Sequence, residues 1–512
     1  MSTRAAWLVA VGLAAVAVVL VVVVAGAHGI GLTPDSAEYL YGAKHLAATG
    51  TYRSVSGDWQ QMFPPGFPAT VALVHLLGPA VDTAARIVNA LAAGVTVLLT
   101  FALLRAHLRS TTVVLGATAL VAVAPPLIAN AATAWSEPQY IALTTGLLLV
   151  LTADLARGAT GLRLIGLAGF VAGVATLTRA LGVSLLPAGL LVIGLAAWHR
   201  RQRMTAALAR AAVFAGAFVL APALWVVPNL VHGVPAFGSH GESVKGLATT
   251  ARVVLANVSD WFLPHGVPTA MRVVGVVAVV AALAFAAGRI WIPLVVTSGA
   301  VVVTLLAFCT FAATRSGADV TTRVLSPALV PALVLTAALV DRLLERHPAR
   351  ALVVVTVVGA VALGGLFVVR TAQLVDDRAR HGYGFATDSW QQSEILAAVR
   401  RLDPDRVVFS TNPGATYLVG DVTPVRRWPT EVSDVRGTPD TDDRAGFLAR
   451  LRCLPGGEAY LLRINRTAHE RRFLPRSALA ADVGFEQVAT TPDGTLWLAR
   501  ARGTRKSDSC PE

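Results

Sequence analysis

The feature that most constrains this chain is a series of long apolar runs, each about as long as a helix that crosses a bilayer. A helix of roughly 20 apolar residues spans the hydrocarbon core. The first run has no small-residue cleavage site after it, so we expect an anchor rather than a cleaved signal peptide. About eleven spans are expected, at residues 6–28, 83–104, 111–129, 138–154, 163–178, 180–198, 211–229, 268–287, 290–312, 323–341 and 351–369.

The composition agrees with these runs. Hydrophobic residues make up 55% of the chain and charged residues only 14%, whereas about a quarter of a soluble domain is charged. The sequence therefore predicts a polytopic α-helical membrane protein and excludes a soluble globular class.

Basic residues between the spans fall mainly on one side of the predicted membrane, and the positive-inside bias makes that side cytoplasmic. We expect a multi-pass plasma-membrane protein with a cytoplasmic N-terminus. The loops at 29–82 and 230–267, and everything after residue 370, are then extracytoplasmic. The basic residues on the cytoplasmic side are Arg4, Arg105, Arg109, Arg157, Arg163, Arg200, Arg201, Arg203, Arg210, Arg289, Arg342, Arg346 and Arg350.

The net charge of +13 belongs to the membrane part. Residues 371–512 hold 20 basic and 19 acidic residues, and residues 1–370 hold 23 basic and 11 acidic residues. The excess therefore reflects topology and contact with anionic membrane lipids, and no nucleic-acid partner is expected. Eight of the 11 acidic residues map to the outer side, namely Asp35, Glu38, Asp58, Asp82, Glu137, Glu242, Asp260 and Asp319.

Residues 371–512 are expected to form a small soluble α/β domain outside the membrane. Helices are expected at 389–401 and 445–451, and strands at 406–410, 458–462, 485–490 and 495–499, the last two as a hairpin. The segment 410–416 is either a ligand loop or an ordinary strand-to-helix turn. An oxidising location makes a disulfide between Cys453 and Cys510 plausible, whereas Cys309 lies inside a span.

An acidic patch follows the first span directly, with Asp35 and Glu38 one helical turn apart. One interpretation is a variant capping box at the start of a short interfacial helix. The other is a site for proton abstraction or cation binding, where partial burial tunes a carboxyl pKa. The helix should stop at Gly50, and a proline turn should lead into a second short helix.

Six short motifs lie within residues 1–370. They are Asp35-Ser-x-x-Tyr39, Gly50-x-Tyr52, Pro64-Pro-Gly-Phe-Pro68, Arg86 with Asn89, Ser136-Glu-Pro138 and Thr178-Arg179. Together they resemble the GT-C superfamily of integral-membrane glycosyltransferases, most nearly the protein mannosyltransferase and aminoarabinose transferase branch. The resemblance covers most of residues 1–370, which would form the transmembrane catalytic domain. It implies many spans and often a soluble extracytoplasmic C-terminal domain.

The resemblance implies an inverting transfer of a hexosyl or pentosyl group from a polyprenyl-phosphate sugar to an acceptor hydroxyl of a cell-envelope glycan, lipid or protein. Asp35 matches the family's catalytic aspartate and would act as general base. Positive side chains would support the leaving phosphate. The candidate substrate-binding residues are Glu38, Tyr39, Lys44, Tyr52, Glu137, Arg179, Arg315 and Arg323.

Structural roles stand beside these functional ones. Arg179 and Arg323 lie at span ends, where arginines snorkel to lipid headgroups. Glu137 begins a span, where the helix dipole alone favours an acid. Glu38 and Tyr39 would serve equally as cap and anchor.

The chain also departs from the branch. Ser36 stands where some members have a second acid, and Phe63 where some have a lysine. No metal-ligand spacing is evident, so no metal or other cofactor is expected. The alternatives are a transporter or flippase, and a non-enzymatic cell-envelope assembly protein. The nearly charge-free span interiors favour the enzyme, because transporters place ionisable groups near the midplane. The Ala-, Val-, Arg- and Gly-rich composition indicates a high-GC, actinobacterium-like source.

Overall fold

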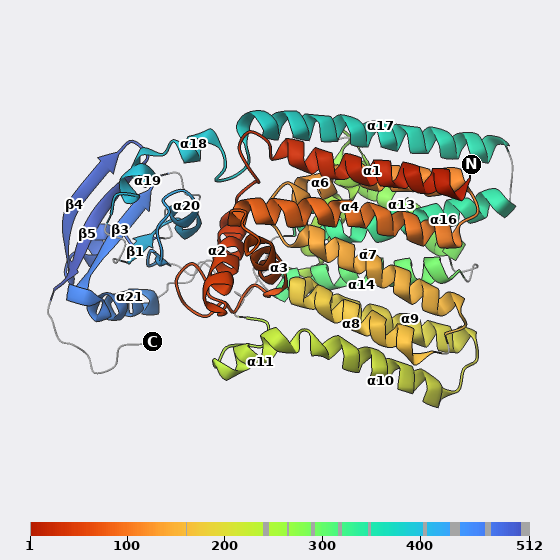
Figure 1. The fold of residues 1–512 in the computed structure, drawn as a ribbon, viewed down its shortest axis with the longest axis horizontal. Helices are drawn as coiled ribbons and strands as arrows, with labels where there is room; N and C mark the ends of the chain where they lie inside the picture. The colour runs from red at the N-terminus through yellow and green to blue at the C-terminus, as the bar shows by residue number, and fades with distance from the viewer. Residues whose placement is uncertain are drawn as a thin grey trace.

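The computed structural model shows a bundle of long helices with a mixed α/β region at one end (Figure 1). The N-terminus lies at the opposite end of the bundle. The described residues are 2–159, 161–238, 245–263, 266–287, 292–315, 320–346, 350–402, 407–430, 441–465 and 473–502.

Most of the bundle consists of helices long and apolar enough to cross a membrane. Within the described residues, seven helices or continuous helical segments meet that condition, and nine if two bent helix pairs each count as one span. The seven are α1 (Thr3–Val24), α4 (Val81–His107), α7 (Glu137–Ala156), η1 with α9 (Ala180–Ser184 and Leu185–His199), α14 (Pro293–Arg315), α15 to α16 (Thr322–Leu325, η2 at Ser326–Ala328, and Leu329–Arg346) and α17 (Arg350–His381). The chain is a multi-pass membrane protein.

Proline explains the two bent pairs. Helix α5 (Thr111–Ala122) meets α6 (Pro125–Ala131) at 45°, and α10 (Met204–Leu220) meets α11 (Ala223–Val231) at 60°. Pro125 and Pro222 stand at the breaks, and proline cannot continue an α-helix because it lacks the N–H donor. The expected spans at 111–129 and 211–229 therefore each coincide with a bent helix pair and not with one continuous helix.

The expectation of many spans is confirmed, whereas the count of about eleven is not, because the described residues hold seven to nine candidate spans. Each expected span coincides with a helix or a helix pair, but α8 (Leu162–Thr178) is a shorter apolar helix of 17 residues. The eighth expected span coincides with α13 (Thr269–Ala287), whose side chains are described only in part. An amphipathic helix, α12 (Leu247–Phe262), precedes it.

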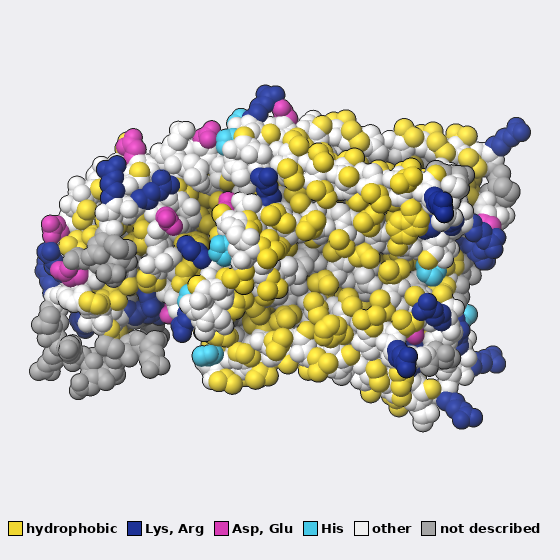
Figure 2. All heavy atoms as spheres, in the orientation of Figure 1, with side chains coloured by type: hydrophobic (Ala, Val, Ile, Leu, Met, Phe, Trp, Pro, Cys, Tyr) yellow, Lys and Arg dark blue, Asp and Glu magenta, His cyan; other side chains and the backbone are white. Residues whose placement is uncertain are grey.

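The outer surface of the bundle is apolar, as lipid contact requires. Hydrophobic side chains cover the face seen in Figure 2, and Lys and Arg gather at the end that holds the N-terminus. Arg109 pairs with Glu345 at that end, and a buried pair joins Arg210 to Asp154. The described arginines that were expected to be cytoplasmic and the acidic first loop therefore lie at opposite ends of the bundle, and Arg289 lies outside the described residues.

The first loop folds as expected, with one correction. Helix α2 (Pro34–Thr49) ends at Gly50, which has a φ of 72°, and α3 (Gly66–His75) follows the proline turn. The capping box at the start of α2 is formed by Thr33 and Ser36 rather than by Asp35 and Glu38. The capping role proposed for Asp35 is therefore wrong, because a residue before it caps the helix.

The C-terminal region alternates short helices with strands. The elements are α18 (Asp388–Gln391), α19 (Glu394–Val399), β1 (Val408–Ser410), α20 (Pro413–Leu418), β2 (Val425–Arg427), α21 (Thr441–Cys453), η3 (Pro455–Gly457), β3 (Glu458–Ile464), α22 (Arg476–Leu479), β4 (Val483–Thr491) and β5 (Gly494–Ala501). The expected helix at 389–401 is broken because Ser393 caps a new helix.

The strands form one mixed five-stranded sheet with strand order β2-β1-β3-β5-β4. Strand β1 pairs in parallel with β2 and β3, and the β4–β5 hairpin confirms the expected turn at residues 492–494.

The C-terminal region shares a core with the first loop. Ala37 of α2 and Val55 are buried in the same hydrophobic cluster as Ile395, Val408 and Leu496. The expected boundary near residue 370 also lies inside α17, which continues to His381. Cys510 lies outside the described residues, so its pairing with Cys453 stays a prediction.

Candidate active site

Arg323 joins two carboxylates at the end of the bundle that carries α2. Its Nη1 donates to Oδ2 of Asp35 over 2.7 Å, and its Nε donates to Oε1 of Glu137. The three residues come from α2, α7 and the short helix α15. The fold therefore assembles a charged cluster from three of the sequence-predicted site residues.

Arg179 completes the cluster from the end of α8. Its Nη1 lies 2.8 Å from Oε1 of Glu137 and donates to the hydroxyl of Ser136 over 3.3 Å. The Glu137 side chain has no exposed surface. A buried charge needs partners, so Glu137 serves as the shared counter-ion that holds the two arginines together.

The Trp135 ring packs against the guanidinium of Arg323. The guanidinium carbon of Arg323 lies 3.7 Å from the centroid of the Trp135 ring, a cation–π contact. The indole N–H of Trp135 donates to Oγ1 of Thr33 over 2.8 Å. The residue that caps α2 therefore also fixes the aromatic ring that orients Arg323.

Asp35 is the accessible carboxylate of the cluster. Its side chain is 36% exposed, whereas that of Glu137 is fully buried. A group that takes a proton from an incoming hydroxyl must be reachable, so Asp35 rather than Glu137 is suited to act as base.

The arginines retain hydrogen-bonding capacity for an anion. A guanidinium carries five N–H donors, and the bonds of Arg323 and Arg179 use only Nε and Nη1. Among the described residues, Nη2 of either arginine has no hydrogen-bond partner. Both side chains are partly exposed, at 19% and 15%, so these donors are available to a phosphate.

Glu38 and Tyr39 face different neighbours. Glu38 accepts hydrogen bonds from the Val55 N–H over 3.2 Å and the Gln60 amide over 2.7 Å. Burial raises the Glu38 pKa to about 7, against the effect of those bonds. The Tyr39 hydroxyl lies 3.1 Å from that of Ser136, and burial raises its pKa to about 12. Tyr39 therefore acts as a neutral tether between α2 and α7.

Three further predicted residues lie apart from the charged cluster. Tyr52 is buried, with its ring against Gly42 of α2. Lys44 is exposed on α2, nine residues beyond Asp35. Arg315 is exposed at the end of α14, with its guanidinium 5.6 Å from the Phe311 ring centroid. The fold does not bring the side chains of Lys44 and Arg315 into the network around Arg323.

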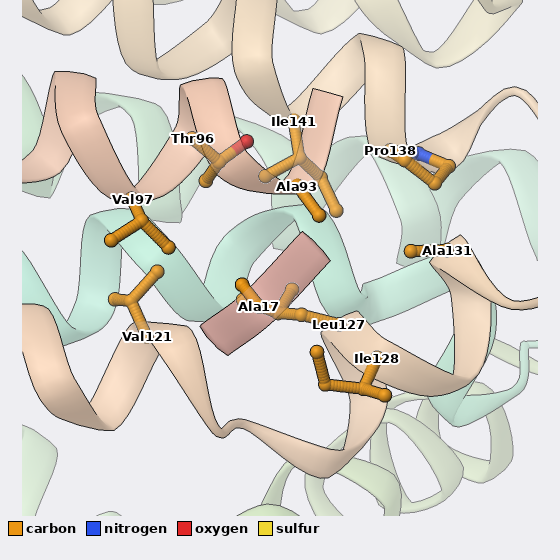
Figure 3. Close-up of a pocket in the computed structure, with 10 residues that line it drawn as sticks. All are labelled: Ala17, Ala93, Thr96, Val97, Val121, Leu127, Ile128, Ala131, Pro138 and Ile141. Atoms are coloured by element: carbon orange, nitrogen blue, oxygen red, sulfur yellow. The ribbon is translucent and has the colours of Figure 1, made fainter. Parts of the chain in front are cut away.

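A small apolar cavity lies inside the bundle (Figure 3), lined from α1, α4, α5, α6 and α7. Its volume is about 20 Å³, enough for about one water. Pro138, the residue directly after Glu137, and Ile141, one turn further along α7, both line it. The cavity is a packing gap too small for a sugar or a lipid phosphate.

In the part of the chain that the structure describes, no group of three or more His, Cys, Asp or Glu side chains is placed to hold a metal ion. The two carboxylates of the cluster are instead joined through Arg323. An arginine therefore occupies the position between them.

Solved structures provide the comparison. ArnT from Cupriavidus metallidurans bound to undecaprenyl phosphate matches with a TM-score of 0.61 over 97% of this chain and 98% of ArnT, at 14% identity. Its apo form matches with a TM-score of 0.61 at 15% identity. Archaeal oligosaccharyltransferase AglB from Archaeoglobus fulgidus, with an inhibitory peptide and a dolichol-phosphate, matches with a TM-score of 0.50 at 12% identity, over 89% of this chain and 69% of AglB.

The chain has the GT-C fold. The match to ArnT extends over nearly the whole of both chains, so it includes the C-terminal region as well as the bundle. No protein-family model matches the sequence, and a search of curated proteins finds no match. The GT-C fold therefore rests on the tertiary structure.

Two contributors to the charged cluster escaped the sequence reasoning. Trp135 and Thr33 were assigned no role, although both help to hold Arg323 and α2. The position of Trp135, directly before Ser136 and Glu137 at a span start, could have indicated its role. An aromatic ring next to a carboxylate that pairs with arginines can form a cation–π contact with one of them. Thr33 stands before Pro34, a pattern typical of a helix N-cap.

Proposed function

We propose that this protein is an inverting glycosyltransferase that moves a sugar from a polyprenyl-phosphate carrier to an acceptor hydroxyl. The observation that carries the proposal is the arrangement of Asp35, an accessible carboxylate, on the same arginine that pairs with buried Glu137. ArnT, which shares the fold, is bound to undecaprenyl phosphate in its structure. A lipid-phosphate donor would give Arg179 and Arg323 a role, because its negatively charged phosphate needs cationic partners.

In this proposal Asp35 takes the proton of the acceptor hydroxyl as its oxygen attacks the anomeric carbon. The new carbon–oxygen bond forms on the face opposite the phosphate, and the bond from that carbon to the phosphate oxygen breaks. The sugar is therefore inverted at the anomeric carbon, and polyprenyl phosphate leaves. Attack and departure on opposite faces require the base and the phosphate-binding cations to flank the sugar.

Charge balance explains why one arginine serves both groups. As the glycosidic bond breaks, the phosphate gains one negative charge, while Asp35 loses one by accepting the proton. Arg323 contacts Asp35 through Nη1 and keeps Nη2 for an anion. Its positive charge is therefore balanced by Asp35 before the proton transfer and by the phosphate after it. Electrostatic support of this kind, already in place before reaction, is the largest single source of catalysis in many enzymes.

The proposed reaction takes place on the extracytoplasmic face. The charged cluster lies at the end of the bundle away from the basic residues that the positive-inside bias assigns to the cytoplasm. The acceptor would be a cell-envelope glycan, lipid or protein, and the sugar a hexose or pentose such as mannose, arabinofuranose or aminoarabinose.

Sugar transfer in membranes tests the proposal. Membranes that contain the protein are given radiolabelled polyprenyl-phosphate sugars of each class, with cell-envelope acceptors, beside Asp35→Asn at matched expression. Transfer by the wild type that is lost in the variant supports the reaction and identifies the donor. Movement of the labelled carrier across the membrane without transfer supports the transporter alternative, and equal transfer by both proteins places the base elsewhere.

A further inference from the structure

The two residues before the cap of α2 are paired with backbone on both sides. On one side, the Gly31 N–H donates to the Ala132 carbonyl over 2.9 Å, and the Ala134 N–H donates to the Gly31 carbonyl over 3.0 Å. On the other side, the Leu32 N–H donates to the Tyr383 carbonyl over 3.1 Å. The Phe385 N–H donates to the Leu32 carbonyl over 2.8 Å.

This bridge joins three segments that are distant in sequence. One leads through Trp135 to Glu137, the second leads to Asp35, and the third connects α17 to the C-terminal sheet. The chain that enters the C-terminal region is therefore part of the scaffold beneath the cluster. Asp35 follows Leu32 by three residues, so a displacement of Leu32 is carried directly to Asp35.

Gly384 makes this close approach possible. Its φ is 62°, in the left-handed region that favours glycine, and a Cβ atom added there would lie 1.9 Å from the Leu32 carbonyl oxygen. That oxygen is the acceptor of the bridge. No side chain fits at Gly384 unless the Leu32 backbone moves.

A second contact from the C-terminal region reaches the same helix. Helix α20 packs on α2, and a Cβ atom added at Gly414 would lie 3.2 Å from the Pro34 Cα and 3.5 Å from the Ala37 Cβ. The rings of Tyr41 and Tyr417 meet edge to face at 5.5 Å between centroids. The segment 410–416, considered as a ligand loop, therefore contacts α2 through the start of α20.

We propose that Gly384, supported by Gly414, is a positioning residue that holds Asp35 in register with Arg323. The C-terminal region is thereby part of the catalytic scaffold. This inference rests on the proposed function, because it assigns the two glycines a role in glycosyl transfer. The inference goes further than the proposed function in one respect. Two glycines of the C-terminal region, outside the charged cluster, would affect the rate of sugar transfer through the position of Asp35.

The test compares Gly384→Ala with Gly29→Ala in purified full-length protein, with the donor and acceptor used by the wild type. Gly29 has a φ of 75° and nothing within 4 Å of an added Cβ atom, so both variants share the backbone strain and only one has the clash. A misplacement of about 1 Å near a reacting group costs about 100-fold in rate. We expect kcat to fall at least about tenfold in Gly384→Ala, with the donor KM changed less than about twofold, and Gly29→Ala to behave like the wild type.

A fold defect is separated by a second variant and by thermal unfolding. At Gly414 an added Cβ atom requires its neighbours to move only a few tenths of an ångström. We expect Gly414→Ala to lower kcat with an unchanged melting temperature. If Gly384→Ala melts far below Gly29→Ala, its kcat reports a fold defect, and the test then rests on Gly414→Ala. A kcat of Gly414→Ala equal to that of the wild type overturns the proposal.

The outcomes distinguish the two proposals. No transfer by the wild type with any donor is a failure of the proposed function, whatever the glycine variants do. Transfer by the wild type with equal kcat in Gly384→Ala and Gly29→Ala is a failure of the positioning role alone. A fall in kcat confined to Gly384→Ala and Gly414→Ala, at constant donor KM, supports it.

Discussion

Arg323 and Asp35, 288 positions apart in the chain, meet through a hydrogen bond of 2.7 Å between Nη1 and Oδ2. The same guanidinium lies against Trp135 and donates through Nε to Glu137. Its plane is therefore fixed by three contacts, and only Asp35 among its carboxylate partners is reachable from outside. Under the proposed function, the carboxylate that takes the proton and the guanidinium that binds the phosphate are held together before any substrate arrives, which is a form of preorganisation.

Asp35→Asn should abolish most of the sugar transfer. An amide is not a base at neutral pH, and a positioned general base contributes about 10²–10⁴-fold to a rate. The measurement is kcat in reconstituted membranes. Asp82→Asn is the matched control, because Asp82 is exposed in the first turn of α4 and its replacement removes the same charge. Equal losses in both variants would point to net charge instead of proton transfer.

Arg323→Lys should lower transfer although the charge is kept. A lysine ammonium is a single compact group and cannot reproduce the guanidinium fork that reaches Asp35 and Glu137 from different nitrogens. We expect a loss of about tenfold or more in kcat/KM, equal to about 1.4 kcal/mol of transition-state stabilisation.

Arg315→Lys is the control for this change, because Arg315 is exposed and contacts Phe311. Its kcat/KM should stay within about twofold of the wild type. A loss in Arg315→Lys as large as that in Arg323→Lys would restore Arg315 to the site.

Glu137→Gln should destabilise the fold more than any other single carboxylate change in the cluster. Its side chain is fully buried against two arginines, and removal of one partner of a buried ion pair costs about 3–5 kcal/mol. Thermal unfolding in detergent measures the effect. Glu345→Gln, at the exposed end of the bundle, should cost less. A melting temperature unchanged in Glu137→Gln would mean that the arginines have other counter-ions.

Glu38 should make stability depend on pH near neutrality. Burial raises its pKa in the folded protein to about 7, above the value of about 4.3 for an unfolded chain. A raised carboxyl pKa contributes stability that is fully present below about pH 4.3 and is lost as pH rises through 7. The wild type should therefore lose stability relative to Glu38→Gln between about pH 4.3 and pH 7.

Melting temperatures of the wild type and Glu38→Gln, taken across that range, check this expectation. Arg500→Gln, an exposed change in the C-terminal sheet, controls for general charge effects. A constant difference between wild type and Glu38→Gln at every pH would mean that Glu38 does not titrate in this window.

Local patterns in the sequence were sufficient for much of the fold. Apolar runs predict spans wherever the helix is straight, because bilayer thickness fixes the length of a spanning helix. At residues 111–129 and 211–229 the apolar runs coincide with bent helix pairs, because Pro125 and Pro222 stand at the breaks. The expected helix at residues 389–401 is likewise broken, because Ser393 caps a new helix. Both kinds of signal are local, but a hydropathy window averages over them.

The sequence by itself determined the class of the protein and the helix that carries Asp35, because these follow from composition and local helix signals. It also named the charged candidates, through short motifs that resemble those of a known family. Only the tertiary structure decided which candidates meet. It brought Asp35, Glu137, Arg179 and Arg323 together and left Lys44 and Arg315 outside. It also placed Gly384 of the C-terminal region under α2. The physical reason is that ion pairs and backbone bridges between distant segments depend on how helices pack, which no single stretch of sequence encodes.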